Sequence, residues 1–283
     1  MLVIGYFFYW LTYITLFLED TVQINKMFFL QKTPVIVQNI LLLIGIIWII
    51  SYGFSNLVRF YQVMLPFFIG FLLVSIGLSL QKIDFSTFFP ILENGFLPLI
   101  KGTIVYCGFL QGIEVILFTY PFFSKGNKKS LYKNALIGVG LINFLALTQI
   151  LISVGGLGLH CVRELLWPNF TVLQLIEIPG LIGERFDLLF TFAWFISLFC
   201  AGILFYYLAA YGIIVAFKIK NKKFIILLVG VFTMMFSYII PNYAWSTLIW
   251  QIINYITIVF IFLIPLLTLL LALFRKQGRP SHD

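Results

Sequence analysis

Charge is scarce in this chain of 283 residues, because only 10% of its residues are charged whereas 62% are hydrophobic. A soluble domain of this length needs far more charge to cover its surface. The core of such a domain could not absorb 33 Phe and 14 Tyr either. The composition therefore excludes a soluble globular domain and predicts a polytopic membrane protein.

Motifs of catalysis and of phosphate binding are also missing. The sequence contains no His-x-x-x-His pair, no Gly-x-Ser-x-Gly turn and no Gly-x-x-x-x-Gly-Lys loop. We find no spaced pair of carboxylates within the predicted membrane helices. Basic residues stand at helix ends without a groove of interleaved aromatic residues, so nucleic acid is not implied. An enzyme is thus the weakest functional class, and no cofactor is predicted.

Cysteine is rare, with Cys107 and Cys200 inside predicted helices and Cys161 in a predicted outer loop. An odd number without close spacing favours neither a disulfide framework nor a metal site. Met1 leads directly into an apolar run without a basic segment or a small-residue cleavage site, so no signal peptide is predicted. The first apolar run resembles an interior helix of something longer.

What the sequence does contain is a series of apolar runs near 20 residues, the length that crosses a bilayer as a helix. We predict an all-α protein with eight transmembrane helices in one integral membrane domain, residues 1–275, followed by a cytoplasmic tail, residues 276–283. The predicted helices lie at about residues 2–18, 35–54, 60–80, 102–123, 131–157, 188–217, 224–240 and 244–274.

The basic residues sort by membrane face. If alternate loops share a side, one side carries twelve of the eighteen Lys and Arg residues, including those at Lys125–Lys133 and Lys218–Lys223. The positive-inside rule makes that side cytoplasmic, so both termini are predicted inside. Eight of the ten acidic residues, beginning with Glu19 and Asp20, then fall in outer segments.

One outer segment, Gly155–Asp187, is too long for a tight connection. Within it, Thr171, Gln174 and Glu177 recur at three-residue spacing among apolar residues. This pattern predicts a short amphipathic helix lying on the outer face.

Glu114 is the one carboxylate that we predict inside a membrane span. An ionisable side chain at membrane depth is costly, so it needs either a function or a partner. As a functional group it would pair with a substrate ammonium or carry a proton. As a structural group it would be a neutral carboxyl hydrogen-bonded to a neighbouring helix.

Two glycines and an amide precede this carboxylate. Gly108 and Gly112 have the spacing that permits close packing of two membrane helices. The same glycines, with Gln111 between them, also suit a helix that unwinds at the midplane and exposes backbone groups to a ligand. The sequence leaves both interpretations open, and it makes Gly108, Gln111, Gly112 and Glu114 the candidate ligand-binding residues.

Several segments together resemble the GerA/GerAB family of spore germination proteins, the permease-like B subunits of nutrient germinant receptors. No single motif is specific, but the order and spacing of the series are. The segments are Phe29–Pro34; Tyr52–Gly53 with Arg59 and Pro66; Phe88–Pro90 with Gly95; Gly112–Glu114 with Pro121–Phe122; and Trp167–Pro168 with Ile178–Pro179, Glu184–Phe186 and Trp194.

The resemblance implies the fold of the amino acid/polyamine/organocation transporter superfamily, in which two inverted repeats of five helices hold a ligand between two broken helices. Matching the segments in order makes the first helix of this chain the third of that fold. We therefore expect a partial, LeuT-like inverted-repeat fold without the first two helices, through truncation, a misassigned start codon or degeneration. The span of Glu114 then corresponds to the second broken helix.

The resemblance also implies a function. We expect a germinant-receptor subunit in the spore inner membrane that senses a small nutrient such as an amino acid and signals to A- and C-type partner subunits. The alternatives are a proton-coupled amino acid permease and an inactive or scaffolding paralogue. Neighbouring genes for A- and C-type subunits would favour the sensor.

Overall fold

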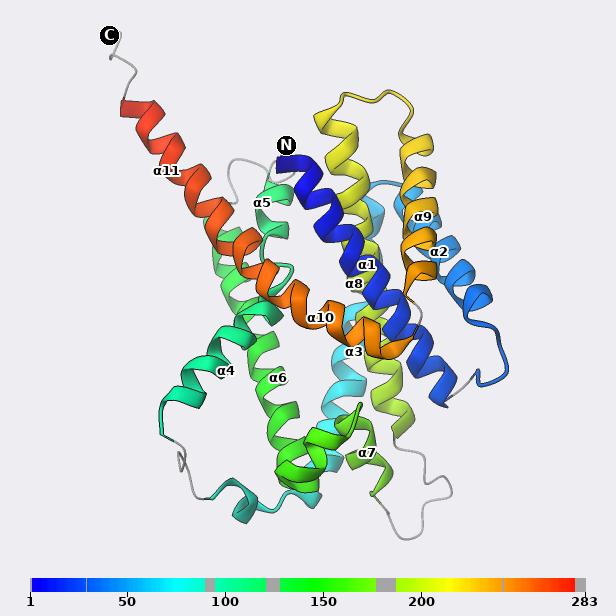
Figure 1. Cartoon of the computed structure of the whole chain (residues 1–283), viewed down its shortest axis with the longest axis vertical. Coiled ribbons are helices and arrows are strands. Elements are labelled where there is room, and N and C mark those ends of the chain that lie inside the picture. Colours follow the sequence, from blue (N-terminus) through cyan, green and yellow to red (C-terminus); the bar gives the residue numbers. More distant parts are fainter. Residues whose placement is uncertain are drawn as a thin grey trace.

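The computed structural model of the chain describes residues 2–28, 30–89, 95–120, 128–176, 187–240 and 242–277. Within these ranges all regular secondary structure is helical. A central helix, α1 (Leu2–Phe28), contacts four others that surround it: α2 (Val35–Ser51), α8 (Asp187–Ala216), α9 (Lys222–Ile239) and α10 (Tyr243–Ile258) (Figure 1).

The middle of α1 is enclosed on every side, since each residue from Tyr13 to Val22 is buried. A helix in such a position is expected to be apolar all round, yet this stretch contains Glu19 and Asp20. The prediction that these two carboxylates lie in an outer loop is wrong. Neither glycine nor proline follows Leu18 within α1, so nothing in the chain ends the helix where the apolar run ends.

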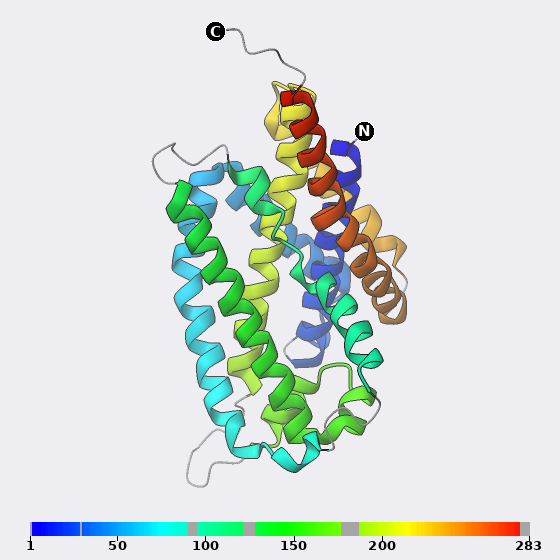
Figure 2. The same ribbon diagram turned by 90° about the vertical axis from the view of Figure 1, so that its left-hand side faces the viewer.

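A second group of long helices stands beside this core. The helix α3 (Phe54–Ser79) packs against α8, and α6 (Lys128–Glu164) runs beside α3 (Figure 2). The Tyr61 hydroxyl donates to the carbonyl of Cys200 at 2.8 Å and ties α3 to α8. Near its end α6 bends at Gly158, whose φ of +79° places it in the left-handed region that glycine tolerates.

Six helices in the described part of the chain are long and apolar enough to cross a membrane, so the protein is a multi-pass membrane protein. The prediction of eight spans is confirmed for these six. They are Leu2–Met27, Phe54–Lys82, Ser130–Glu164, Leu188–Ala216, Lys222–Ile239 and Tyr243–Phe274.

The other two predicted spans are shorter or interrupted. The run predicted at 35–54 forms α2, which has 17 residues and ends before Gly53, where φ is +86°. The run predicted at 102–123 is divided between α4 (Leu97–Cys107) and α5 (Val115–Thr119). Residues 121–127, with Pro121 and Lys125, lie outside the described residues.

The last apolar run changes its helical form in the middle. After α10 comes a π-helical turn, η6 (Val259–Leu263), and then α11 (Ile264–Gln277). The π-turn ends two residues before Pro265, whose ring cannot fit a regular helix without displacing a hydrogen bond. Short 3₁₀ turns occur at η1 (Leu80–Lys82), η2 (Phe85–Phe88) and η3 (Gly108–Leu110).

The two ends of the bundle carry different elements. The start of α1, the connection between α8 and α9 and the end of α11 lie at one end, and α7 (Pro168–Gln174) lies at the other (Figure 1). The helix predicted around Thr171 is therefore present as α7. Its apolar residues Phe170, Val172 and Leu173 are buried, so α7 packs into the bundle. Glu177, the last residue of the predicted pattern, lies outside the described residues.

Candidate functional site

The helix that was predicted to hold the ligand is broken at its glycines. Regular α4 ends at Cys107, η3 follows, and four residues in turn conformation precede α5. Gly112 lies in these turns with φ of +100°, a conformation that costs an L-residue with a side chain. The interruption that the sequence left open is therefore present, and Gly112 is the residue that makes it possible.

Gly108 serves the other purpose that was considered, close helix packing. A Cβ atom at this position would lie 2.6 Å from Cβ and 2.8 Å from the carbonyl oxygen of Asn254. No real Cβ atom comes this close to a neighbour, so only glycine lets this segment rest on α10. The two glycines thus have separate tasks, packing at 108 and the chain reversal at 112.

Glu114 ends the turn with its side chain almost wholly buried, at 1% exposure. Its Oε2 accepts the backbone N–H of Gly112 at 2.9 Å, whereas its buried Oε1 has no hydrogen-bond partner. From α1, the Tyr9 hydroxyl and the Trp10 indole point toward this carboxylate as nearby donors, although neither reaches hydrogen-bond distance of Oε1. Phe118 of α5 packs edge-on against Trp10, with ring centroids 4.7 Å apart. The carboxylate is therefore held between the broken helix and α1.

Unpaired polar atoms gather around the break. Buried polar groups are nearly always hydrogen-bonded, so each exception marks a place for water, a ligand or strain. Four such atoms belong to residues of the break, of α1 and of α10 beside it. They are Trp10 Nε1, Gln111 Oε1, Glu114 Oε1 and Asn254 Oδ1.

The part of α1 that lies near Glu114 is also joined to η6, the π-turn that follows α10. The Tyr6 hydroxyl donates to the carbonyl of Phe260 in η6 at 2.8 Å, and the Tyr9 ring stacks on the Phe260 ring with centroids 4.5 Å apart. One turn further along α1, the hydroxyls of Tyr13 and Thr257 share a hydrogen bond of 2.5 Å. Single π-turns within α-helices occur frequently at functional sites.

A second carboxylate centre lies further along α1, and sequence reasoning missed it. Glu19 Oε1 accepts the Ser237 hydroxyl of α9 at 2.5 Å and the Asn39 amide of α2 at 3.5 Å. Asp20 Oδ2 accepts the Trp250 indole N–H of α10 at 3.1 Å. The one signal in the sequence was the lack of any helix breaker between Leu18 and the end of α1, which hydropathy does not register.

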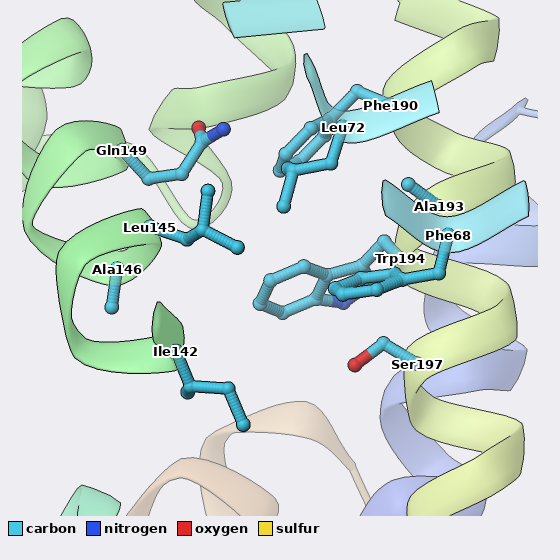
Figure 3. A pocket seen from close by; sticks show the side chains of 10 residues that line it. All are labelled: Phe68, Leu72, Ile142, Leu145, Ala146, Gln149, Phe190, Ala193, Trp194 and Ser197. Carbon is cyan, nitrogen blue, oxygen red and sulfur yellow. The ribbon is translucent and has the colours of Figure 1, made fainter. Parts of the chain in front are cut away.

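A cavity of about 160 Å³ lies elsewhere, between α3, α6 and α8. Figure 3 shows Leu72, Leu145 and Trp194 around it, with the amide of Gln149 at one edge and the hydroxyl of Ser197 at another. Its lining is apolar and includes none of the predicted ligand-binding residues. In the described part of the chain no three His, Cys, Asp or Glu side chains come together to hold a metal ion.

Comparison with known proteins gives a consistent result. A family model described as "Spore germination protein" matches residues 1–244. Spore germination protein A2 of Bacillus subtilis is 27% identical over 280 residues, which are 98% of this chain and 74% of that protein. Spore germination proteins YndE and KB of the same organism are 24% and 25% identical, over 90% and 93% of this chain and 70% and 71% of their own lengths. No solved structure matches the chain.

Proposed function

Because the chain belongs to the spore germination protein family, we propose that it is the nutrient-sensing, permease-like B subunit of a germinant receptor in the spore inner membrane. Membership makes it a membrane subunit without enzymatic activity, and its helices make it multi-pass. Its ligand would be a small nutrient such as an amino acid. Its partners would be the A- and C-type subunits of the receptor.

The observation that carries this proposal is the group of unpaired polar atoms around Glu114. A carboxylate oxygen without a donor, buried within a membrane protein, is suited to an ammonium group, which has three N–H donors and a compensating charge. Gln111 and the indole of Trp10 add one acceptor and one donor nearby. An α-amino acid carries the charges and hydrogen-bonding groups that such a set would satisfy.

The four candidate residues would act in different ways. Glu114 would pair with the ammonium group and Gln111 would hydrogen-bond the ligand. Gly112 would hold the chain open, and its own N–H is engaged by Glu114 Oε2. Gly108 would act indirectly, by letting the broken helix rest on α10.

Signalling would follow from the same arrangement. The broken helix contacts both α1 and α10, so a ligand that bridges them would favour one relative position of these helices over another. A ligand shifts a conformational equilibrium only by its difference in affinity for the two states. Partner subunits would recognise the state in which the ammonium group of the ligand is paired to Glu114.

Replacing Glu114 with glutamine is expected to abolish the nutrient response or to raise the half-maximal nutrient concentration at least about tenfold. Glutamine keeps the size of the side chain and can still accept the Gly112 N–H, but it loses the charge. A hydrogen bond to a charged group contributes about 1.5–3 kcal/mol, and about 1.4 kcal/mol is a factor of ten. The measurement is germination of spores that carry the variant within a complete receptor.

Glu164→Gln is the matched control, because Glu164 is exposed at the end of α6. This variant is expected to respond like the unmodified receptor, and immunoblots should find both variants at normal levels. A normal response from Glu114→Gln would make Glu114 a structural carboxyl. Nutrient uptake without a germination response would favour a permease instead.

We also propose that both termini face the cytoplasm. The start of α1 and the end of α11 share one end of the bundle with the basic connection between α8 and α9 (Figure 1). That connection carries Lys218 and Lys220, and basic loops stay on the cytoplasmic side. The opposite end, with α7, would face outward.

Cys161 offers a native reporter of this orientation, since it is exposed near the end of α6, the helix that contacts α7. A membrane-impermeant maleimide is expected to label Cys161 in intact cells and to leave Cys161→Ser unlabelled. The Lys220→Cys variant, made in the Cys161→Ser background, is expected to react only after the membrane is permeabilised. Labelling of that variant in intact cells would reverse the orientation.

A further inference from the structure

Asp20 is a buried carboxylate with an open oxygen. The residue is 7% exposed, and its Oδ2 accepts the indole N–H of Trp250 at 3.1 Å. Its Oδ1 is buried and has no hydrogen-bond partner. An ionised carboxylate in this position is expected to have a donor or a cation on each oxygen. A buried charged group without a partner costs more free energy of desolvation than a buried neutral group does.

A second open oxygen belongs to α10. Trp250 of that helix donates to Asp20, and Tyr243 lies within electrostatic range of it. Ser246 follows Tyr243 by three residues and precedes Trp250 by four, so it lies between them on the same face of the helix. Its side chain is 1% exposed, and its Oγ has no partner. Ser246 Oγ on α10 and Asp20 Oδ1 on α1 are thus two buried polar atoms without a hydrogen-bond partner, on helices that contact each other.

The residue next to Asp20 along α1, Glu19, is a second buried carboxyl group. Glu19 differs from Asp20 in one respect. Its Oε1 already accepts hydrogen bonds from the Ser237 hydroxyl and the Asn39 amide.

We propose that Asp20 and Ser246 bind a small monovalent cation between α1 and α10. Carboxylate and hydroxyl oxygens without histidine or cysteine suit a hard cation and not a transition metal. The cation could be an inorganic ion such as Na⁺ or K⁺, or the ammonium group of a primary amine, because both satisfy several oxygen acceptors with one positive charge. The site is separate from Glu114 and does not depend on the function proposed there.

The test is the thermal unfolding of the purified full chain in detergent, followed by tryptophan fluorescence. Four chloride salts are compared at equal ionic strength: sodium, potassium, methylammonium and choline, the last being a bulky quaternary cation without an N–H donor. At least one of the first three is expected to raise Tm by about 4 °C or more above choline, since a ligand that binds only the folded state stabilises it by mass action. A response to sodium or potassium identifies an inorganic ion, and a response to methylammonium alone identifies an amine.

Asp20→Asn is expected to remove this response, because asparagine can still accept from Trp250 but carries no charge. Ser246→Ala keeps the charge and is expected to raise the cation concentration needed for half the effect about tenfold, the value of one hydrogen bond. Glu19→Gln is the matched control and is expected to retain the response. Equal Tm values in all four salts, or an undiminished response in Asp20→Asn, would overturn the proposal.

Discussion

Replacing Gly108 with alanine is expected to destabilise the folded protein by about 1–3 kcal/mol, the usual cost of overpacking. The new methyl group would lie 2.8 Å from the carbonyl oxygen of Asn254 and 2.9 Å from its Cα. Both are backbone atoms, so they cannot turn aside as the end of a side chain can, and α10 would have to move. The measurement is Tm of the purified chain in detergent, together with the yield of monodisperse protein.

Gly102→Ala is the matched control for this prediction. Gly102 belongs to α4 just before the break, and a Cβ atom there would meet nothing within 4 Å. Alanine is favoured over glycine in a helix by about 1 kcal/mol, so this variant is expected to keep or raise Tm. The two substitutions should therefore have opposite signs. A similar fall in both would mean that the segment needs flexibility, and that the close approach to α10 is not what selects glycine.

The pair Gly108 and Gly112 shows how far sequence reasoning reaches at this site. Their spacing supports close packing and unwinding equally well, because both interpretations rest on the absence of a side chain. What distinguishes them is the distance from Gly108 to Asn254, and that residue is remote in the sequence. The depth of Glu114 within an apolar run could be predicted from local composition, whereas the break was one of two open interpretations and the division of tasks between the glycines could not be predicted.

Glu19 and Asp20 show where that reasoning fails. A hydropathy pattern counts two adjacent carboxylates as the end of a membrane helix, and it placed them in an outer loop. They are buried because Ser237, Asn39 and Trp250 supply donors. These donors come from α9, α2 and α10, and no pattern local to α1 contains them. Buried polar groups in a membrane protein are specified by the tertiary packing that pairs them.

The ends of the helices were predicted more accurately than the buried carboxylates, because helix ends depend on residues that are near in the sequence. The predicted run at 35–54 was too long by only a few residues, because the turn at Tyr52 and Gly53 needs a positive φ that the apolar composition does not reveal. The amphipathic pattern around Thr171 did predict a helix, α7. Its burial could not be predicted, since an apolar stripe fits a membrane surface and a protein surface equally well.

Replacing Ser237 with alanine is expected to destabilise the protein by about 1.5–3 kcal/mol, the worth of a hydrogen bond to a charged group. The Ser237 hydroxyl is the closer of two donors to Glu19 Oε1. Without it, this oxygen would keep the Asn39 amide as a donor, at the long distance of 3.5 Å. A buried carboxylate that loses its donor bears the cost of its own desolvation. The measurement is again Tm in detergent.

Two further variants separate the pairing from the loss of a hydroxyl. Ser75→Ala removes another buried hydroxyl, one that donates to the carbonyl of Phe71 in its own helix, so it should cost less than about 1 kcal/mol. In a Glu19→Leu background no carboxylate needs the donor, and Ser237→Ala should then cost little. The difference between the two backgrounds is the coupling energy of the pair, which for contacting residues is about 0.5–3 kcal/mol. Equal costs of Ser237→Ala in both backgrounds would show that the hydroxyl stabilises α9 alone and that α1 is fixed by its apolar packing.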